Sequence, residues 1–185
     1  NAPSADDSAT AKRNLENVLT NLKGDTTGFK DNVDIYSSVP YSRDTVNLAN
    51  LLADDAELLY RSKPNSIVGP VVSQQGYVLY HLVSTVPSTE PTVKASHILI
   101  NQFGSEEKNL EEANKVYAEL IAGADFEKIA REKSFDKGSG EKGGYLGWFT
   151  KGAMVPEFET GAFNAKVGEI TKPVKTSYGY HIIKV

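Results

Sequence analysis

Histidine is the side chain in this sequence best suited to proton chemistry near neutral pH, and the chain carries three: His81, His97 and His181. Cysteine is absent, which excludes disulfides, thiolate catalysis and cysteine-based zinc sites. A histidine on an apolar strand is usually a core residue with its hydrogen bonds satisfied. The histidines alone therefore leave two interpretations open, a structural one and a catalytic one.

A glycine-rich apolar segment, residues 143–158 (GGYLGWFTKGAMVPEF), is the second feature that could serve a site. Its large apolar side chains are Leu146, Trp148, Phe149, Met154 and Phe158. Glycines 143, 144 and 147 permit tight turns among them, so the segment is a poor helix and a short strand at best. By composition it is either a pocket wall or ordinary core. Asp136, in the preceding SFDKGSG, is by itself an ordinary turn residue.

The elements that must position these residues begin with a strand over residues 94–101, in which Ala95, His97 and Leu99 share one face. A helix follows over 106–122, with acidic residues in its first turn and Gly123 at its end. Shorter helices are predicted over 126–133 and 156–163, and strands near 172–175 and 179–185.

The first half of the chain gives a similar series of elements. Leu15, Val18, Leu19 and Leu22 predict an amphipathic helix that ends near Gly24. Further helices are predicted over 29–36 and 45–60, and a hairpin over 68–83 with its turn at Gln74, Gln75 and Gly76. Residues 86–92 (VPSTEPT) are the best linker candidate.

The two halves read as copies of one another. Phe29 and Ser37 match Phe126 and Ser134 at an offset of 97 residues; Pro70, Val71, Gly76 and Tyr77 match Pro173, Val174, Gly179 and Tyr180 at an offset of 103. The first copy has Val39 at the position of Asp136 and Val78 at that of His181. Its counterpart of strand 94–101 would fall before residue 1. We therefore expect the chemistry in the second copy, with the first binding or scaffolding.

Composition narrows the class of protein. The 185 residues are 39% hydrophobic and 24% charged with a net charge of -4, which is typical of soluble domains and argues against nucleic acid or an anionic membrane surface as partner. No apolar run approaches the ~20 residues of a membrane span. The start, Asn1-Ala2-Pro3, has neither an initiator methionine nor a signal sequence, so we expect a fragment of a longer protein behind a cloning scar.

Five motifs resemble the parvulin-type peptidyl-prolyl cis/trans isomerases. They are ASHILI (95–100), FEKIAREKSFD (126–136), GGYLGWF (143–149), MVPEF (154–158) and SYGYHIIKV (177–185). The resemblance implies an α+β fold of two tandem parvulin-like domains, each a small antiparallel sheet wrapped by helices, with four strands in the second. The expected domains are 1–85, degenerate and truncated, and 93–185, the isomerase, joined by linker 86–92. The arrangement is similar to envelope foldases of the SurA, PpiD and PrsA kind, with a membrane-anchored PpiD-like protein of a Gram-negative bacterium preferred.

The resemblance also implies roles for the residues of the second copy. Leu146, Met154 and Phe158 form the family's proline-ring pocket, with Trp148 and Phe149 supporting its wall. Asp136 faces the substrate carbonyl, and His97 and His181 hydrogen-bond to one another beneath the site, with Ser134 and Thr176 completing the network. No cofactor is expected, and no metal, because His81 belongs to the other copy.

The activity implied is isomerisation of X-Pro bonds in unfolded or nascent polypeptides, in a bacterial cell envelope and specifically the periplasm. The loop NQFGSEEKN after strand 94–101 is acidic where phosphate-dependent parvulins are basic, so an uncharged or apolar residue before proline is expected. Tyr145 and Tyr178 depart from the family pattern and could weaken activity. The alternative is a noncatalytic holdase chaperone that binds unfolded chains through both copies.

Overall fold

The computed structural model describes residues 5–73 and 76–185, and the chain divides into two compact units. Unit 1 comprises residues 1–47 and 54–87, and unit 2 comprises residues 48–53 and 88–185. The chain thus enters unit 2 for one short segment, returns to unit 1, and leaves it again after residue 87. Over the described ranges, none of the helices combines the length and the apolar character needed to span a bilayer.

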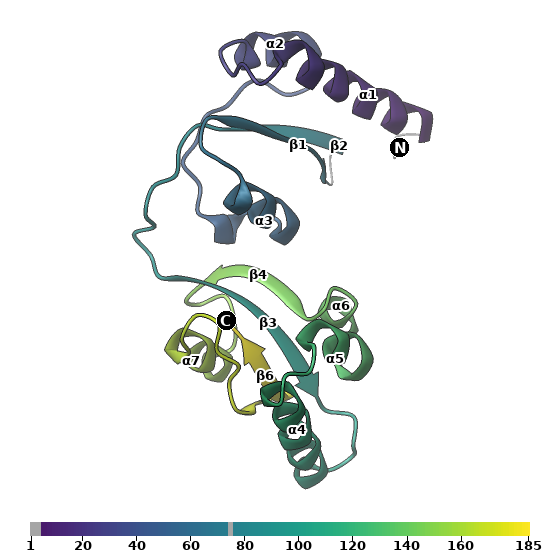
Figure 1. The fold of residues 1–185 in the computed structure, drawn as a ribbon, viewed down its shortest axis with the longest axis vertical. Helices are drawn as coiled ribbons and strands as arrows, with labels where there is room; N and C mark the ends of the chain where they lie inside the picture. Colours follow the sequence, from purple (N-terminus) through teal and green to yellow (C-terminus); the bar gives the residue numbers. More distant parts are fainter. Residues whose placement is uncertain (1–4, 74–75) are drawn as a thin grey trace. The chain divides into compact units, whose positions relative to one another are not determined.

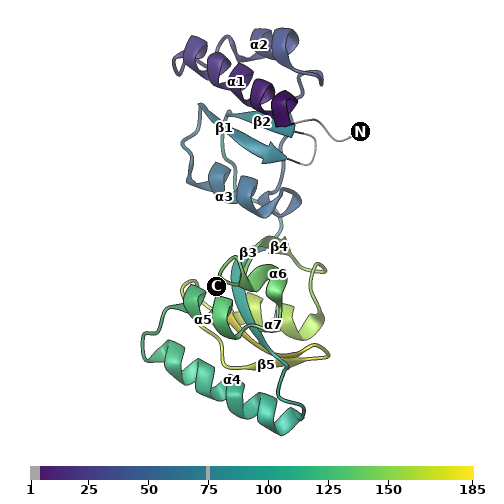
Figure 2. The same ribbon diagram turned by 90° about the vertical axis from the view of Figure 1, so that its right-hand side faces the viewer.

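Unit 1 is a β-hairpin with helices on both faces (Figures 1 and 2). Its elements are α1 (Ala5–Leu22), α2 (Phe29–Tyr36), α3 (Ala53–Arg61), β1 (Ser66–Ser73) and β2 (Gly76–Leu82). Val18, Leu22 and Phe29 are buried in a core that α1 and α2 share with the hairpin. The predicted helices before residue 37 and the predicted hairpin are confirmed, while Gln74 and Gln75 of its turn lie outside the described residues.

The helix predicted over residues 45–60 is wrong in its first half. The structure has a 3-10 turn, η1 (Leu48–Asn50), and α3 begins only at Ala53. Residues 48–53 belong to unit 2, where η1 packs against strand β4 (Tyr145–Thr150), so packing overrides the helical spacing of the leucines. Asp54 and Asp55 in the first turn of α3 are typical of a helix start.

Unit 2 is an α+β unit built on a four-stranded antiparallel sheet of order β4-β3-β6-β5 (Figure 1). Besides β4, its elements are β3 (Thr92–Ile100), α4 (Glu106–Ile121), α5 (Phe126–Lys133), α6 (Lys137–Gly140), α7 (Pro156–Asn164), β5 (Val174–Thr176) and β6 (Gly179–Lys184). The α+β class and the four strands of the second half are confirmed. The four-residue helix α6 was not predicted, and the residues of β4 were predicted as a short strand at best.

The two faces of this sheet bury different cores, because side chains alternate along each strand. Ile98, Ile100 and Ile182 face α4 and α5, in a cluster completed by residues such as Val116 and Phe126. The alternate residues Ala95 and Ile183 face α7, where they meet Phe149, Phe158 and Ala162. His97 and His181 have the strand parity of this second face, so the sheet presents both histidines on the α7 side.

A register shift in β4 decides which of its side chains reach the α7 side. Ala95 pairs with Gly147 but the next residue, Ser96, pairs with Tyr145, so Leu146 is an extra residue in the ladder. Such a bulge re-aims side chains. Leu146 and Phe149 consequently pack in the same cluster. Trp148 pairs with Lys94 on the opposite face, where the Lys94 ammonium lies 5.6 Å from the indole centroid.

The hairpins of the two units have the same register at the offset predicted from the sequence. Val71 pairs with Val78 and Ser73 with Gly76 in unit 1, while Val174 pairs with His181 and Thr176 with Gly179 in unit 2. Each of these residues in unit 2 has a number 103 higher than its counterpart in unit 1. Helix α2 likewise begins and ends 97 residues before α5.

Candidate functional site

Four side chains from separate elements form a continuous hydrogen-bonded chain on the α7 side of the sheet. The Nδ1 atoms of His97 and His181 lie 2.9 Å apart, and the two rings are nearly parallel. Nε2 of His97 lies 2.9 Å from Oδ2 of Asp136, and Nε2 of His181 lies 2.8 Å from the Thr176 hydroxyl. All four imidazole nitrogens therefore have protein partners, which leaves none of them unused for a metal ion.

The elements place these groups for identifiable reasons. In the β3–β6 register His181 is opposite Leu99, one diagonal step from His97 on the same face. Asp136 is the N-cap of α6, and its Oδ1 accepts the backbone N–H groups of Gly138 and Ser139. Asp136 is thus the turn residue that its local sequence indicates, and its other carboxylate oxygen faces His97.

The partners fix one direction for the protons. An ionised Asp136 can only accept, so His97 donates from Nε2 and keeps an unprotonated Nδ1 when neutral. That Nδ1 accepts from Nδ1–H of His181, whose bare Nε2 accepts from the Thr176 hydroxyl. The Tyr178 backbone N–H donates to the Thr176 oxygen at 3.0 Å, so every bond runs towards the carboxylate.

Burial keeps both histidines neutral. His97 and His181 are 6% and 5% exposed. Burial lowers the pKa of His97, although the hydrogen bond and charge of Asp136 oppose the shift. Burial, followed by the charge of His97, lowers the pKa of His181 to about 4. Burial would raise the pKa of Asp136, but hydrogen bonds from Ser139 and His97 outweigh it and lower the pKa.

Two serines lie near these hydrogen-bonded side chains, and they have different partners. Ser139, which the sequence analysis missed, donates to Oδ2 of Asp136 at 2.6 Å, and its oxygen lies 3.0 Å from His97 Nε2. Its position three residues after a capping aspartate was the available signal. Ser134 is fully buried at the C-cap of α5, where its hydroxyl accepts the Leu99 N–H at 3.2 Å. Ser134 thus anchors β3 and bonds neither histidine.

The predicted pocket residues divide between two faces of the sheet. Phe158 is buried with its ring edge-on to both histidines, at centroid distances of 5.8 Å and 5.3 Å, and it also contacts Phe149. Leu146 and Met154 are half-buried against the same cluster, and the Glu159 carboxylate accepts the Met154 N–H at 2.9 Å. Trp148 lies on the far face and does not join them.

Gly144 explains one turn of the glycine-rich segment. Its carbonyl accepts the His97 N–H at 2.8 Å, and its φ of +82° is in the left-handed region. A Cβ there would lie 2.3 Å from the His97 carbonyl oxygen. Glycine at this position therefore lets the segment approach β3 closely enough to hold the backbone of His97.

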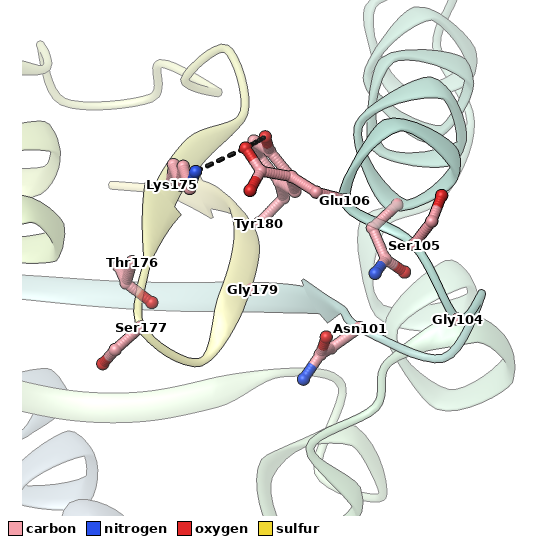
Figure 3. A pocket seen from close by; sticks show the side chains of 10 residues that line it. Asn101, Gly104, Ser105, Glu106, Lys175, Thr176, Ser177, Gly179 and Tyr180 are labelled. Atoms are coloured by element: carbon pink, nitrogen blue, oxygen red, sulfur yellow. Dashed lines mark hydrogen bonds and ion pairs between the residues drawn. The ribbon is translucent and has the colours of Figure 1, made fainter.

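A cavity of about 420 Å³ opens beside Thr176, at that end of the hydrogen-bonded chain (Figure 3). The loop between β3 and α4 lines one side and the β5–β6 hairpin the other. Glu106 bridges the two sides, forming an ion pair with Lys175 and accepting the Tyr180 hydroxyl at 3.2 Å. These side chains are polar, so the cavity differs in character from the apolar cluster around Phe158.

Comparison with known proteins places this geometry in a family. The family model described as the PPIC-type PPIase domain matches residues 77–185. The foldase protein PrsA of Geobacillus kaustophilus is 52% identical over 96 residues, covering 52% of this chain and 32% of the relative. PrsA of Exiguobacterium sibiricum is 55% identical over 94 residues, covering 50% and 29%.

A parvulin-like PPIase of Rickettsia bellii is 37% identical over 154 residues, covering 82% of this chain and 50% of the relative. Among solved structures, the peptidylprolyl isomerase PrsA of Bacillus anthracis is 47% identical with a TM-score of 0.47, covering 51% of this chain and 41% of that one. The chain spans about a third of the length of the PrsA relatives it matches. With the match over 77–185, this chain belongs to the PPIC-type peptidyl-prolyl isomerase family, the parvulin type that its motifs resemble.

Proposed function

We propose that unit 2 catalyses cis/trans isomerisation of X-Pro bonds in unfolded polypeptides and so assists their folding. The observation that carries the proposal is the chain from Thr176 through His181 and His97 to Asp136, in contact with Phe158 of the apolar cluster. Membership of an isomerase family, and relatives named as foldases, support the same activity.

Rotation about an X-Pro bond needs no bond cleavage, only stabilisation of a twisted amide against a barrier of ~20 kcal/mol. The proline ring packs on the half-buried surface of Leu146 and Met154, next to Phe158. A twisted amide has lost much of its charge separation, so an apolar surface favours it over the planar amide. The same packing places the amide beside the histidine pair.

Asp136 acts through its charge in this mechanism. Its oxygens already accept from Gly138, Ser139 and His97, which makes it a poor nucleophile. The side chain remains 35% exposed, so the carboxylate can still face a substrate carbonyl. The histidines, Ser139 and Thr176 hold it in position, and catalysis is noncovalent.

The substrate residue before proline is uncharged or apolar in this proposal. The first turn of α4 carries Glu106 and Glu107, and neither it nor the preceding loop has a lysine or arginine before Lys108, so this segment would repel a phosphate group. Tyr178, whose backbone N–H donates to the Thr176 oxygen, has a side chain that is 60% exposed and available to contact a bound peptide. The substrates are therefore unfolded segments without phosphate.

We further propose that unit 1 is a degenerate copy of the same domain, with residues 1–85 as its extent, 86–92 as linker and 93–185 as the isomerase. The shared hairpin register at an offset of 103 and the shared helix bounds at 97 support this assignment. Val39 and Val78 replace Asp136 and His181, so unit 1 is noncatalytic.

We also propose that the protein works in the bacterial cell envelope, in the periplasm, as part of a longer, PpiD-like foldase. The support is the resemblance to tandem envelope foldases and the limited share of the PrsA relatives that this chain covers. Its partners there are nascent or unfolded polypeptides that contain X-Pro bonds.

The direct test is NMR exchange of a nonphosphorylated Leu-Pro or Ala-Pro peptide, comparing the intact chain with Asp136→Ala and Met154→Ala. Both substitutions should reduce the exchange rate by about tenfold or more, since each removes a group placed at the amide or the proline ring. Asp125→Ala is the matched control for the first, because Asp125 caps α5 in the same way through Lys128 N–H. Ile170→Ala, half-buried on the other face of the sheet, is the control for the second.

Exchange that never exceeds the uncatalysed rate at saturating protein would refute the isomerase proposal. If the same samples suppressed aggregation of an unfolded client, a noncatalytic holdase would be the better description.

A further inference from the structure

The outer edge of strand β2 has no neighbouring strand in the part of the chain that the structure describes. Strand β6, which aligns with β2 at the offset of 103, lies between β5 and β3. Strand β2 pairs with β1 alone. Among the described residues, no strand of unit 1 therefore occupies the edge that β3 occupies in unit 2.

Exposure along the two strands reflects this difference. Tyr180 to Ile183 in β6 are all buried, whereas every residue of β2 is only half-buried. Yet both faces of β2 have helices over them: Leu79 packs with the α1 core, and the Tyr80 hydroxyl donates to Asp55 of α3 at 2.8 Å. Figures 1 and 2 show the hairpin between α1 and α3. Among the described residues, β2 lacks only a strand paired to its outer edge.

Helix α1 also presents apolar surface suited to one more strand. Leu15, Val18 and Leu22 have the spacing of Ala113, Val116 and Leu120 in α4. Ala113 is completely buried in the core that β3 completes with Ile98 and Ile100. Leu15, its counterpart, remains half-buried. Leu15 therefore keeps apolar surface exposed at the position where Ala113 is completely covered.

In length and composition, β2 lacks the features that commonly keep edge strands from pairing. Natural edge strands are usually short, or interrupted by lysine or proline. Strand β5, the edge next to β6, fits that description with three residues that include Lys175. Strand β2, GYVLYHL, has seven residues without lysine, arginine, acidic residue or proline. Such an edge is suited to main-chain pairing.

We propose that the outer edge of β2 binds an extended, mostly apolar polypeptide segment as an added antiparallel strand. The occupant is argued from the established interface of this molecule, in which β3, an extended segment with apolar residues on both faces, covers the equivalent edge of β6. Residues 1–87 contain seven lysines and arginines against ten acidic residues, which favours a neutral or basic segment over an acidic one. The inference rests on the proposed descent of unit 1 from the same domain, and it gives that unit a client-binding role.

The probe is a nine-residue peptide with the sequence of β3, TVKASHILI, added to the intact chain. Binding is measured by fluorescence anisotropy and located by amide hydrogen exchange. We expect saturable binding and new protection of alternate amides within Tyr77–Leu82, with no change in β5. Main-chain pairing gives affinity and the side chains give selectivity, so a peptide of the same composition with its residue order scrambled should bind more weakly.

N-methylated peptides distinguish strand addition from general apolar binding. A strand offers its amides alternately to its two edges, so methylating alternate residues blocks only one edge. One set is Val93, Ala95, His97 and Leu99 of the peptide sequence, and the other is Lys94, Ser96, Ile98 and Ile100. One methylated peptide should bind as the parent does and the other should lose affinity on the order of tenfold or more.

Three results would overturn the proposal: no saturable binding, equal loss with both methylated peptides, or β2 amides that are all protected before any peptide is added. The last would mean that a second copy or another part of the protein already covers the edge. Isomerisation of a four-residue Ala-Pro substrate, measured in the same samples, is independent of this edge. Failure of strand binding with isomerisation intact would therefore leave the proposed catalytic function standing.

Discussion

His97 and His181 constrain each other's protonation because their Nδ1 atoms face one another across 2.9 Å. One Nδ1 must be bare to accept the proton of the other, so the pair can carry at most one extra proton without losing its hydrogen bond. Asp136 and Thr176 at the two ends then set the direction of every bond. Neutral rings in one fixed arrangement are a preorganised support for the groups above them.

This arrangement predicts that unit 2 loses stability on mild acidification. His181 has an ordinary pKa of 6.5 when unfolded and about 4 when folded. Between these pH values the unfolded chain binds more protons than the folded chain. The contribution of neutral His181 to folding stability is therefore complete above pH 6.5 and is lost as the pH falls towards 4. The loss should reach about 3 kcal/mol. Urea unfolding followed by the fluorescence of Trp148, the single tryptophan, measures it in unit 2.

In the His181→Asn variant the slope of unfolding free energy against pH between 4 and 6.5 should be clearly smaller. An unchanged slope would show that other groups cause the acid sensitivity and would contradict a strongly lowered pKa at His181.

Asp136→Asn should lower the pKa of His97 further. Burial already lowers it, and the hydrogen bond and charge of Asp136 oppose that shift, so removing the charge removes the opposition. Asparagine has one acceptor oxygen, so it keeps either the cap of α6 or the bond from His97 Nε2, and in both cases the charge that opposes the shift is lost. Imidazole 15N shifts across a pH titration report the change, with Asp125→Asn as the matched control. A rise in the pKa of His97 would contradict the assignment of its Nε2 proton to the carboxylate.

The sequence predicted the side chains of the hydrogen-bonded chain, but it did not predict all of the residues that contact them. His97, His181, Asp136 and Thr176 were predicted together and lie together, because the family motifs fix their elements. Ser139 was missed because its role depends on α6, a helix too short to leave a periodic signal.

The resemblance placed Ser134 and Trp148 in the site but could not show which way either side chain points. Trp148 follows the regular alternation of the strand, so it points to the side opposite its neighbour Phe149, which faces α7. The orientation of Ser134 is fixed by its hydrogen bond to the Leu99 backbone, a contact between distant segments.

At the scale of elements, long amphipathic helices and alternating strands were predicted well, and elements shaped by contacts from elsewhere were not. The helix predicted over 45–60 has the right leucine spacing for a single helix. The segment 48–53 instead packs on β4, which no local pattern in those residues could indicate.

Gly147→Ala tests that packing. Gly147 has a φ of +81°, and a Cβ there would lie 2.8 Å from the Cβ of Ala53. Gly152 has a φ of +91° with no atom within 4 Å of its Cβ position, so Gly152→Ala measures backbone strain alone. Gly147→Ala should cost about 1–3 kcal/mol more than this control, from overpacking. Urea unfolding followed by Trp148 fluorescence measures both.

The double variant Gly147→Ala with Ala53→Gly should recover most of the difference, because it removes the atom that clashes. Equal losses in Gly147→Ala and Gly152→Ala, or no recovery in the double variant, would mean that segment 48–53 does not pack on β4 as described.

At the scale of the whole molecule, the sequence repeat predicted two halves with matching hairpins, and the shared register agrees with that offset. The repeat could not predict that residues 48–53 would join the other unit, since an offset between copies says nothing about contacts between them. Nor could it show how unit 1 completes its sheet, because the counterpart of β3 has no match within these residues.

Limited proteolysis should cut the chain between β2 and β3 without abolishing isomerisation. Residues 84–91, between β2 and β3, are exposed and lie outside the regular elements, so a nonspecific protease should cut there first. The histidine chain and the apolar cluster all lie within 93–185, so the cleaved sample should retain most of its activity in the X-Pro exchange assay. Mass spectrometry identifies the cut, and Asp136→Ala, cleaved in the same way, gives the background rate. Loss of activity on cleavage, with the Trp148 fluorescence of unit 2 unchanged, would mean that catalysis requires a covalent connection to unit 1, against its proposed noncatalytic role.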